Sequence, residues 1–354
     1  MDAAKKPETA PADIAVEFNK VNIVFGTHPQ RALPLMDKGM SRTDIQKQTG
    51  QILGVHDCSL TVARGEILVL MGLSGSGKST LLRAVNGLNP VCRGSVTVHD
   101  QGWHCNVSSA SREDLLKVRR ECVAMVFQQF GLLPWRTVRE NVGLGLELAG
   151  QNPDQLREKV DGQLKLVGLH ERADAKVGEL SGGMQQRVGL ARAFVTDAPI
   201  LLMDEPFSAL DPLIRTRLQD ELLELQAKLK RTIIFVSHDL DEAFKIGNRI
   251  ALMDGGRIVQ CGTAREIIAN PVSDYVADFV NHMNPLSVLT ARDAIEPTPN
   301  AIPTSGETGI DTPIKDVMRA LKGDTRGLKL VEHGQVVGQI TRASVIARLL
   351  DPRG

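Results

Sequence analysis

Three short runs of apolar residues are the clearest pattern in the chain: Ile67–Met71, Ile200–Met203 and Ile233–Val236. Uninterrupted apolar runs of this length predict strands that are buried on both faces, as parallel strands are. Apolar residues recur at helical spacing over residues 154–169 and 213–230, which predicts amphipathic helices. Strands that alternate with helices indicate an α/β fold around a mostly parallel sheet.

The segments before the first apolar run have a different pattern. Residues 1–13 are polar and rich in Pro and Ala, and we expect them to be disordered. Residues 14–25 predict strands, whereas residues 26–50 have a mixed composition. Within them, Ser41 followed three residues later by Asp44 predicts the start of a helix.

The C-terminal part has the composition of a linker followed by a small folded segment. Residues 286–313 contain several prolines among Thr, Ser, Asn and Gly, which predicts a Pro-rich linker. Residues 314–354 then predict a helix, two strands joined at Gly334, and a second helix. A unit of about 40 residues is marginally stable alone, so we expect this tail to need a partner.

Composition narrows the functional classes. The 354 residues suggest about two domains at ~150 residues each. Lys plus Arg and Asp plus Glu each number 42, and the aromatic content is 3%, which argues against a nucleic-acid partner. No apolar run approaches ~18 residues, so no membrane-spanning helix is expected. Five scattered cysteines without a Cys-x-x-Cys pair, and no apolar leader, favour a reduced cytosol.

A phosphate-binding loop follows the first apolar strand. Residues 72–79 fit the pattern G-x-x-x-x-G-K-[ST], in which backbone N–H groups converge on an anion at a helix start. Lys78 is expected to reach the β- and γ-phosphates of ATP, and Ser79 to bind Mg²⁺. The expected nucleotide ligands here are Gly72, Ser74, Gly75, Ser76, Gly77, Lys78, Ser79 and Thr80.

Polar residues end the other two apolar strands. Asp204 and Glu205 follow the strand at 200–203, where an α/β sheet places its ligands. We expect Asp204 to hold Mg²⁺ and Glu205 to act as the general base that orients or deprotonates water. His238 ends the next strand and is a candidate for hydrogen bonding to the γ-phosphate.

With these residues in place, the chain resembles the ATP-binding subunit of an ATP-binding cassette (ABC) importer over residues 14 to about 285. Leu180–Arg187 looks like the family signature, Gln128 like its Q-loop glutamine, Ser208–Asp211 like its D-loop, and His238 like its switch histidine. The resemblance implies a phosphate-loop NTPase with a RecA-like sheet, an antiparallel β subdomain and a helical subdomain at about 131–195.

The resemblance also implies roles and partners. Members dimerise head to tail around two ATP molecules, so signature residues of one subunit would contact the nucleotide of the other. Gln128 would touch Mg²⁺ or the attacking water. Residues 130–138 would help form a groove for a helix of the membrane permease. Further nucleotide contacts implied by the family are Phe25, Ser181, Gly182, Gly183, Gln185 and Asp211; for Phe25, a buried core position is the alternative.

The same resemblance implies a location and a system. The chain would be peripheral, on the cytoplasmic face of the bacterial inner membrane, and an extracytoplasmic binding protein would deliver the solute. The insertion at 26–50 resembles the glycine betaine, proline and choline uptake branch. The tail resembles the end of one cystathionine-β-synthase (CBS) repeat, and this short tail favours choline. Alternatives are an ABC importer for another small solute and a non-transport ABC ATPase.

Overall fold

The computed structural model describes residues 13–128, 131–281, 284–296, 304–322 and 326–350. Residues 1–12, which we expected to be disordered, lie outside this set. The chain divides into two units: residues 1–238 with 253–258, and residues 239–252 with 259–354. Within the part of the chain described, no helix has the length and apolar character needed to cross a membrane.

The central sheet has six strands in the order β10-β9-β3-β8-β7-β6. The pairs β3–β8, β8–β7 and β7–β6 are parallel, and every residue of β3, β7 and β8 is buried. This confirms the three strands predicted from the apolar runs. Because their carboxyl ends meet at one edge, the residues that follow each strand come together there. The bounds are β3 (Ile67–Met71), β6 (Val123–Val126), β7 (Ile200–Asp204), β8 (Thr232–Val236), β9 (Arg249–Asp254) and β10 (Arg257–Gly262).

A second, antiparallel sheet has the order β2-β1-β4-β5, with β1 (Ile14–Phe25), β2 (Ile52–Ala63), β4 (Arg93–Asp100) and β5 (Trp103–Asn106). Residues 14–25 form one long strand with several register shifts against β2. The pairing of Phe25 with Ile52 closes the insertion between β1 and β2 at its base.

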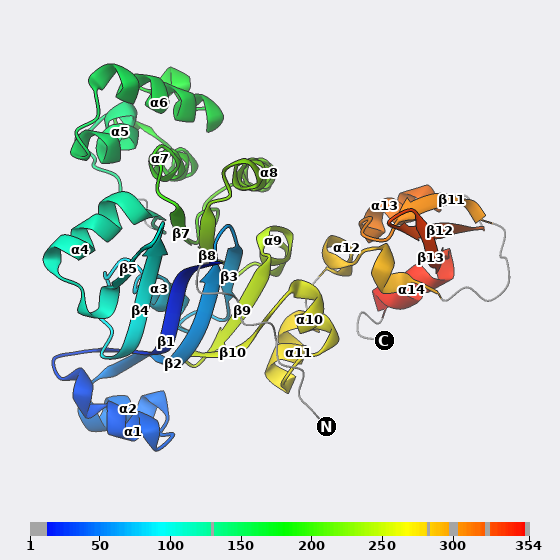
Figure 1. The fold of residues 1–354 in the computed structure, drawn as a ribbon, viewed down its shortest axis with the longest axis horizontal. Coiled ribbons are helices and arrows are strands. Elements are labelled where there is room, and N and C mark those ends of the chain that lie inside the picture. Colours follow the sequence, from blue (N-terminus) through cyan, green and yellow to red (C-terminus); the bar gives the residue numbers. More distant parts are fainter. Residues whose placement is uncertain (1–12, 129–130, 282–283, 297–303, 323–325, 351–354) are drawn as a thin grey trace. The chain divides into compact units, whose positions relative to one another are not determined.

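The insertion folds into a short 3₁₀ turn (Pro29–Arg31) and the helices α1 (Leu33–Asp37) and α2 (Arg42–Thr49), drawn in blue beside β1 and β2 in Figure 1. The predicted cap is confirmed: the Ser41 hydroxyl accepts a hydrogen bond from the Asp44 N–H at 3.2 Å. Ile45 is fully buried in a small apolar cluster that includes Val24 and Leu53. The insertion is therefore packed onto the sheet.

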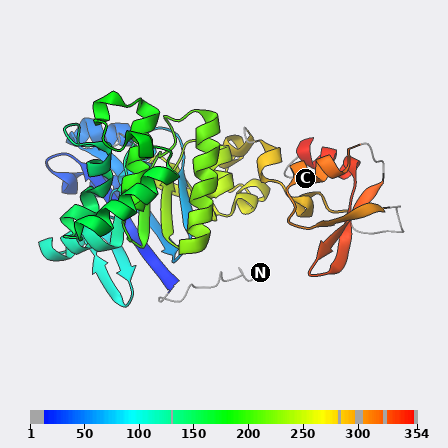
Figure 2. The same ribbon diagram turned by 90° about the horizontal axis from the view of Figure 1, so that it is seen from above.

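Three helices form the helical subdomain: α5 (Val138–Leu148), α6 (Pro153–Leu166) and α7 (Gly182–Phe194). They share one apolar cluster, and both ribbon views show them together in green (Figures 1 and 2). Residues 112–122 form α4 (Arg112–Lys117) and a π-helical turn (Val118–Cys122). Also in this unit are α3 (Lys78–Leu82), α8 (Pro212–Leu229) and the 3₁₀ turns Val107–Ser109, His170–Arg172 and Val177–Glu179.

The other unit ends in the tail, where a three-stranded sheet of order β11-β12-β13 packs with helices (orange to red in Figures 1 and 2). The helix–strand–strand–helix prediction corresponds to α13 (Ile314–Ala320), β12 (Gly327–Glu332), β13 (Gln335–Ile340) and α14 (Arg342–Leu350). Earlier elements of the unit are α9 (Leu240–Ile246), α10 (Ala264–Ala269), α11 (Asp274–Asn281), α12 (Pro285–Val288), a 3₁₀ turn (Ala291–Ala294) and β11 (Thr304–Gly309).

Much of the expected linker at 286–313 is instead part of this folded tail. Leu289, Ala291 and Ala294 are buried in the same apolar cluster as α13 and β12, and β11 pairs in parallel with β12. Of the prolines in this segment, Pro313 lies at the cap of α13, and Pro285, just before the segment, lies in the first turn of α12. A missing N–H costs nothing at these positions, so a high proline content does not by itself indicate a linker.

Candidate nucleotide-binding site

A cavity of about 640 Å³ opens at the carboxyl edge of β3, β7 and β8. It brings together most of the residues that the sequence predicted. Its lining comprises Phe25, Arg42, Gln46, Ile52, Leu53, Gly54, Ser74, Gly75, Gly77, Lys78, Ser79, Thr80, Gln128, Glu205 and His238.

The conformation of the phosphate loop requires glycine at two positions. Gly72 has φ +141°, and a Cβ there would lie 2.1 Å from the Met253 carbonyl oxygen. Gly77 has φ +101°, and a Cβ there would lie 2.7 Å from the Gly54 carbonyl oxygen. Side chains are excluded at both positions by sterics and by the left-handed backbone, so the loop can curl closely around a ligand.

The loop has the polar groups that an anion needs. Lys78 is 6% exposed, and its Nζ donates hydrogen bonds to the carbonyls of Gly72 at 2.8 Å and Leu73 at 2.9 Å. Burial lowers the pKa of Lys78, because the charged form loses solvation. The Ser76 hydroxyl is buried and has no hydrogen-bond partner among the described residues. A buried cation and an unsatisfied hydroxyl fit a phosphate ligand.

The expected metal ligands are adjacent to each other. Ser79 Oγ donates to Asp204 Oδ1 at 2.6 Å, and Arg83 Nη2 donates to Asp204 Oδ2 at 2.8 Å. Asp204 is fully buried. A hydroxyl and a carboxylate suit Mg²⁺, a cation that usually keeps waters and substrate phosphates among its ligands. In the described ranges, no group of three or more His, Cys, Asp or Glu side chains could hold a metal ion.

Glu205 lies at the centre of the polar groups around the cavity. Its Oε2 accepts a hydrogen bond from Gln128 Nε2 at 3.2 Å and lies 3.3 Å from His238 Nδ1. Its backbone has φ +48°, a strained conformation for a non-glycine residue. Gln186 Nε2 donates to the Glu205 carbonyl at 3.4 Å, which helps hold that conformation. Gln128 thus contacts Glu205 and makes no hydrogen bond to Asp204 or Ser79.

The signature and D-loop residues do not line this cavity. Ser181 is exposed and caps α7 by accepting from the Met184 N–H. Gln185 Nε2 donates to the carbonyls of Val177 and Leu180, and Asp211 caps α8. Gly182 and Gly183 begin α7. Within one chain, the contacts of these residues are therefore local and structural.

Some predicted residues lie at the edge of the cavity or below it, and others that belong to the site were not predicted. Phe25 is 37% exposed and lines the cavity, so the alternative of a buried core position was wrong. Gly72, Ser76 and Asp204 lie beneath the lining in the loop and at the strand end. Sequence reasoning missed Arg42 and Gln46 of the insertion, and also Arg83 and Gln186. The cap at Ser41 predicted the helix that carries Arg42 and Gln46, but it did not indicate that this helix lies beside the phosphate loop.

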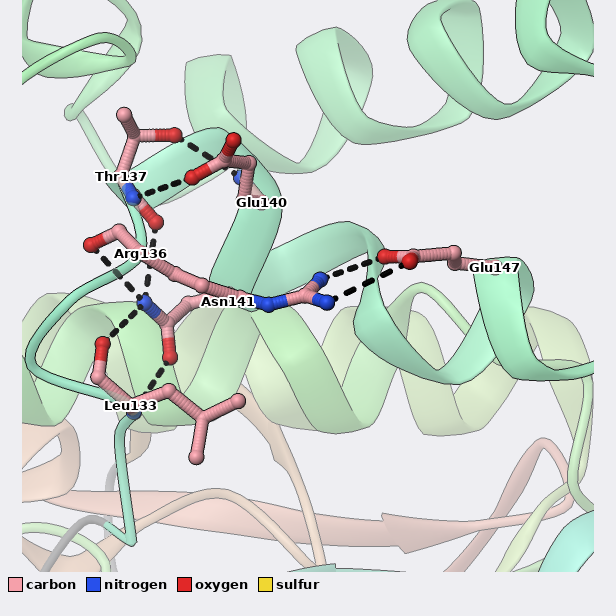
Figure 3. A network of polar contacts seen from close by, with 6 residues as sticks. All are labelled: Leu133, Arg136, Thr137, Glu140, Asn141 and Glu147. Carbon is pink, nitrogen blue, oxygen red and sulfur yellow. Dashed lines mark hydrogen bonds and ion pairs between the residues drawn. The ribbon is translucent and has the colours of Figure 1, made fainter.

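The segment after Gln128 is held by a buried amide. Asn141, fully buried in the first turn of α5, accepts a hydrogen bond from the Leu133 N–H at 2.8 Å (Figure 3). Its Nδ2 donates to the carbonyls of Leu133, Arg136 and Thr137 at 3.1, 3.4 and 2.9 Å. Thr137 and Glu140 form a reciprocal cap at the same helix start. These contacts fix residues 133–137, where Trp135 is 69% exposed.

These features together define a phosphate-loop ATPase site: the glycine-lined loop, the buried lysine, the paired hydroxyl and carboxylate, and the glutamate at the strand end. The family described as ABC transporter matches residues 55–208. The chain is 50% identical over 289 residues, 82% of its length and 71% of the relative's, to the "Glycine betaine/proline betaine transport system ATP-binding protein ProV" of Escherichia coli (strain K12). The chain therefore belongs to the ATP-binding proteins of the ABC transporter family, which bind and hydrolyse ATP.

Two further relatives are similar along nearly the whole chain. The glycine betaine/carnitine transport ATP-binding protein GbuA of Listeria monocytogenes serotype 1/2a is 38% identical, with 94% of this chain and 97% of the relative covered. The trimethylamine N-oxide transport ATP-binding protein TmoW of Ruegeria pomeroyi is 42% identical, with 92% and 94% covered. A solved dimeric bacterial ABC transporter cassette superposes with a TM-score of 0.61 at 28% identity, over 70% of this chain and 98% of that one.

Proposed function

We propose that this chain is the ATP-hydrolysing subunit of a bacterial ABC importer for quaternary ammonium compounds and related methylated amines. The 50% identity to ProV is the observation that supports this most strongly. Glycine betaine is the first solute to test, since two of the relatives described above carry it in their names. Choline, which the short tail favoured, and trimethylamine N-oxide are its competitors.

In the proposed reaction, a water oxygen attacks the γ-phosphorus of ATP, and the bond to the β–γ bridging oxygen breaks to give ADP and phosphate. Lys78 and the N–H groups of the phosphate loop bind the phosphates and offset their charge. Glu205 orients the water and takes its proton, while Gln128 and His238 hold the Glu205 carboxylate. Bound by Ser79 and Asp204, Mg²⁺ would withdraw charge from the phosphate oxygens.

The active unit of this proposal is a dimer. Ser181, Gly182 and Gly183 lie at the exposed start of α7, where N–H groups are available to an anion. In a head-to-tail pair this helix start would face the phosphate loop of the second subunit and complete its site. The dimeric state of the similar bacterial cassette supports a dimer as the active unit.

The proposed permease contact lies next to the segment fixed by Asn141. A cavity of about 380 Å³ there is lined by mostly apolar residues that include Phe127, Gly131, Leu144 and Leu148. The exposed Trp135 lies in the adjoining loop. Such a surface suits a short helix from a membrane subunit, which would hold this chain at the cytoplasmic face of the inner membrane.

Uptake and reconstitution test this function together. Cells that lack this chain should lose uptake of radiolabelled glycine betaine, and a plasmid copy should restore it. The complex purified with its permease and its extracytoplasmic binding protein should show ATPase activity that rises on addition of the solute. Unlabelled choline and trimethylamine N-oxide compete in the same assay. Normal uptake of all three solutes in the deletion strain would rule out the proposed solute class.

A further inference from the structure

The insertion at 26–50 borders the nucleotide cavity. Helix α2 contributes Arg42 and Gln46 to the lining of that cavity, alongside the phosphate loop. Both residues lie on the turn of helix around Ile45, whose side chain is fully buried against Val24 and Leu53. Since the Ser41 cap fixes the first turn of α2, the position of Arg42 is set by packing and hydrogen bonding.

Arg42 links three segments at the rim of the cavity. Its Nη1 donates to the carbonyl of Gly75, in the middle of the phosphate loop, at 2.8 Å. Its Nη2 donates to the carbonyl of Gly54, in β2, also at 2.8 Å. The planar guanidinium reaches two acceptors at once, which a lysine ammonium on a flexible stem does less well. The insertion is thereby connected to the loop that binds phosphate.

The charge of Arg42 is only partly compensated. Its Nε is enclosed and has no hydrogen-bond partner among the described residues. Burial lowers the pKa of Arg42, and the negative charge of Asp254 offsets part of that effect. A half-buried cation whose hydrogen bonds go to neutral carbonyls gains stability when an anion binds beside it. The cavity that Arg42 lines is the place where the ATP phosphates are proposed to bind.

We propose that Arg42 is a nucleotide-binding residue, supplied by the insertion, that holds the phosphate loop through Gly75 and attracts the polyphosphate of the bound nucleotide. This inference rests on the placement of ATP in this cavity under the proposed function. The insertion would then take part in nucleotide binding, and the nucleotide site would include a residue outside the motifs around the phosphate loop.

The test compares variants of the full chain. Arg42→Met keeps most of the aliphatic stem and removes the charge, and Arg42→Lys keeps the charge without the planar fork. Lys47→Met, at an exposed position of the same helix and outside the cavity lining, removes one positive charge as the matched control. Affinities for ATP, ADP and AMP are measured by competition with a fluorescent ATP analogue, and thermal unfolding is recorded for each variant.

We expect Arg42→Met to lower the affinity for ATP and ADP roughly ten-fold or more, because charge-assisted hydrogen bonds are lost. The affinity for AMP should fall much less. Arg42→Lys should recover part of the loss, and Lys47→Met should match the wild type. The steady-state KM for ATP should rise more than kcat falls. Affinities of Arg42→Met within two-fold of the wild type would overturn the proposal. An equal loss for ATP, ADP and AMP would also overturn it, since that is the result of a purely structural role.

Two additions keep the result interpretable. Lys78→Met tests whether the nucleotide binds in this cavity. If Lys78→Met binds ATP normally, the placement of the nucleotide is wrong. If Lys78→Met loses ATP binding while Arg42→Met binds normally, only the role of Arg42 is refuted. If Arg42→Met does not fold, the ratio of ATP to AMP affinity in Arg42→Lys decides. An unchanged ratio in that variant counts against the proposal.

Discussion

The loop between Gln128 and α5 depends on one buried amide, and Asn141→Ala should show how much stability it provides. Asn141 makes four side-chain hydrogen bonds to residues 133–137, three of them no longer than 3.1 Å (Figure 3). The substitution leaves the Leu133 N–H and the Arg136 carbonyl without partners, whereas the carbonyls of Leu133 and Thr137 keep hydrogen bonds from the N–H groups of Arg136 and Asn141. At about 1–2 kcal/mol for each of these two groups left unsatisfied, the free energy of unfolding should fall by about 2–4 kcal/mol.

Urea unfolding of the purified chain, followed by circular dichroism, measures this change. The matched control is Glu147→Gln, which removes the exposed ion pair between Arg136 and Glu147 in the same network. Exposed pairs contribute little, so its unfolding midpoint should stay near that of the wild type. A destabilisation of Asn141→Ala no larger than that of the control would refute the reasoning. Asn141→Ala should also lower solute-stimulated ATPase in the permease complex more than basal ATPase.

Three further predictions concern the base, a buried thiol and the tail. Glu205→Gln should keep ATP binding and lower ATP hydrolysis about 10²–10⁴-fold, trapping ATP-bound dimers on size exclusion; a normal hydrolysis rate would exclude Glu205 as the base. Burial raises the pKa of Cys58 to about 11. As the pH rises, this thiol therefore loses its proton in the unfolded chain first, and the free energy of unfolding should fall from about pH 9 to 11. Cys58→Ala should weaken that pH dependence, and Cys261→Ala should weaken it less. In the tail, Ile346 is 44% exposed. If the tails pair across the dimer, Ile346→Glu should weaken ATP-independent association, measured by light scattering, and an unchanged association constant would argue that the tails do not pair.

The sequence predicted the parts of the site that lie within single motifs. The phosphate loop, Asp204, Glu205 and His238 follow apolar strands, and parallel pairing brings the ends of those strands together. Their convergence could be expected because the direction of a parallel strand determines which end carries its ligands. For these residues, the sequence motifs and the parallel topology were enough to predict that they lie together.

Contacts between distant segments could not be predicted in the same way. Arg42 and Gly75 are 33 positions apart, and Arg83 and Asp204 are 121 apart. No sequence pattern identifies the residues of either pair as partners, because each contact depends on how separate elements pack. The tail was underestimated for a related reason: the burial of Leu289 and Ala294 comes from contacts with α13 and β12, whereas the surrounding prolines suggested a linker.

Helix α7 connects the signature residues to Glu205, the proposed base, and to the segment that begins at Gly131. Its first residues carry the exposed signature, and one turn later Gln186 donates to the Glu205 carbonyl. Near its end, Arg192 Nη1 donates to the Gly131 carbonyl at 2.7 Å, in the segment after Gln128. Because these contacts lie along one helix, a displacement of its first turn would act on the proposed base and on the proposed permease surface together. Closure of a second subunit onto Ser181 would therefore act on the strained backbone of Glu205 through α7, and a single helix would link the proposed dimer formation to ATP hydrolysis.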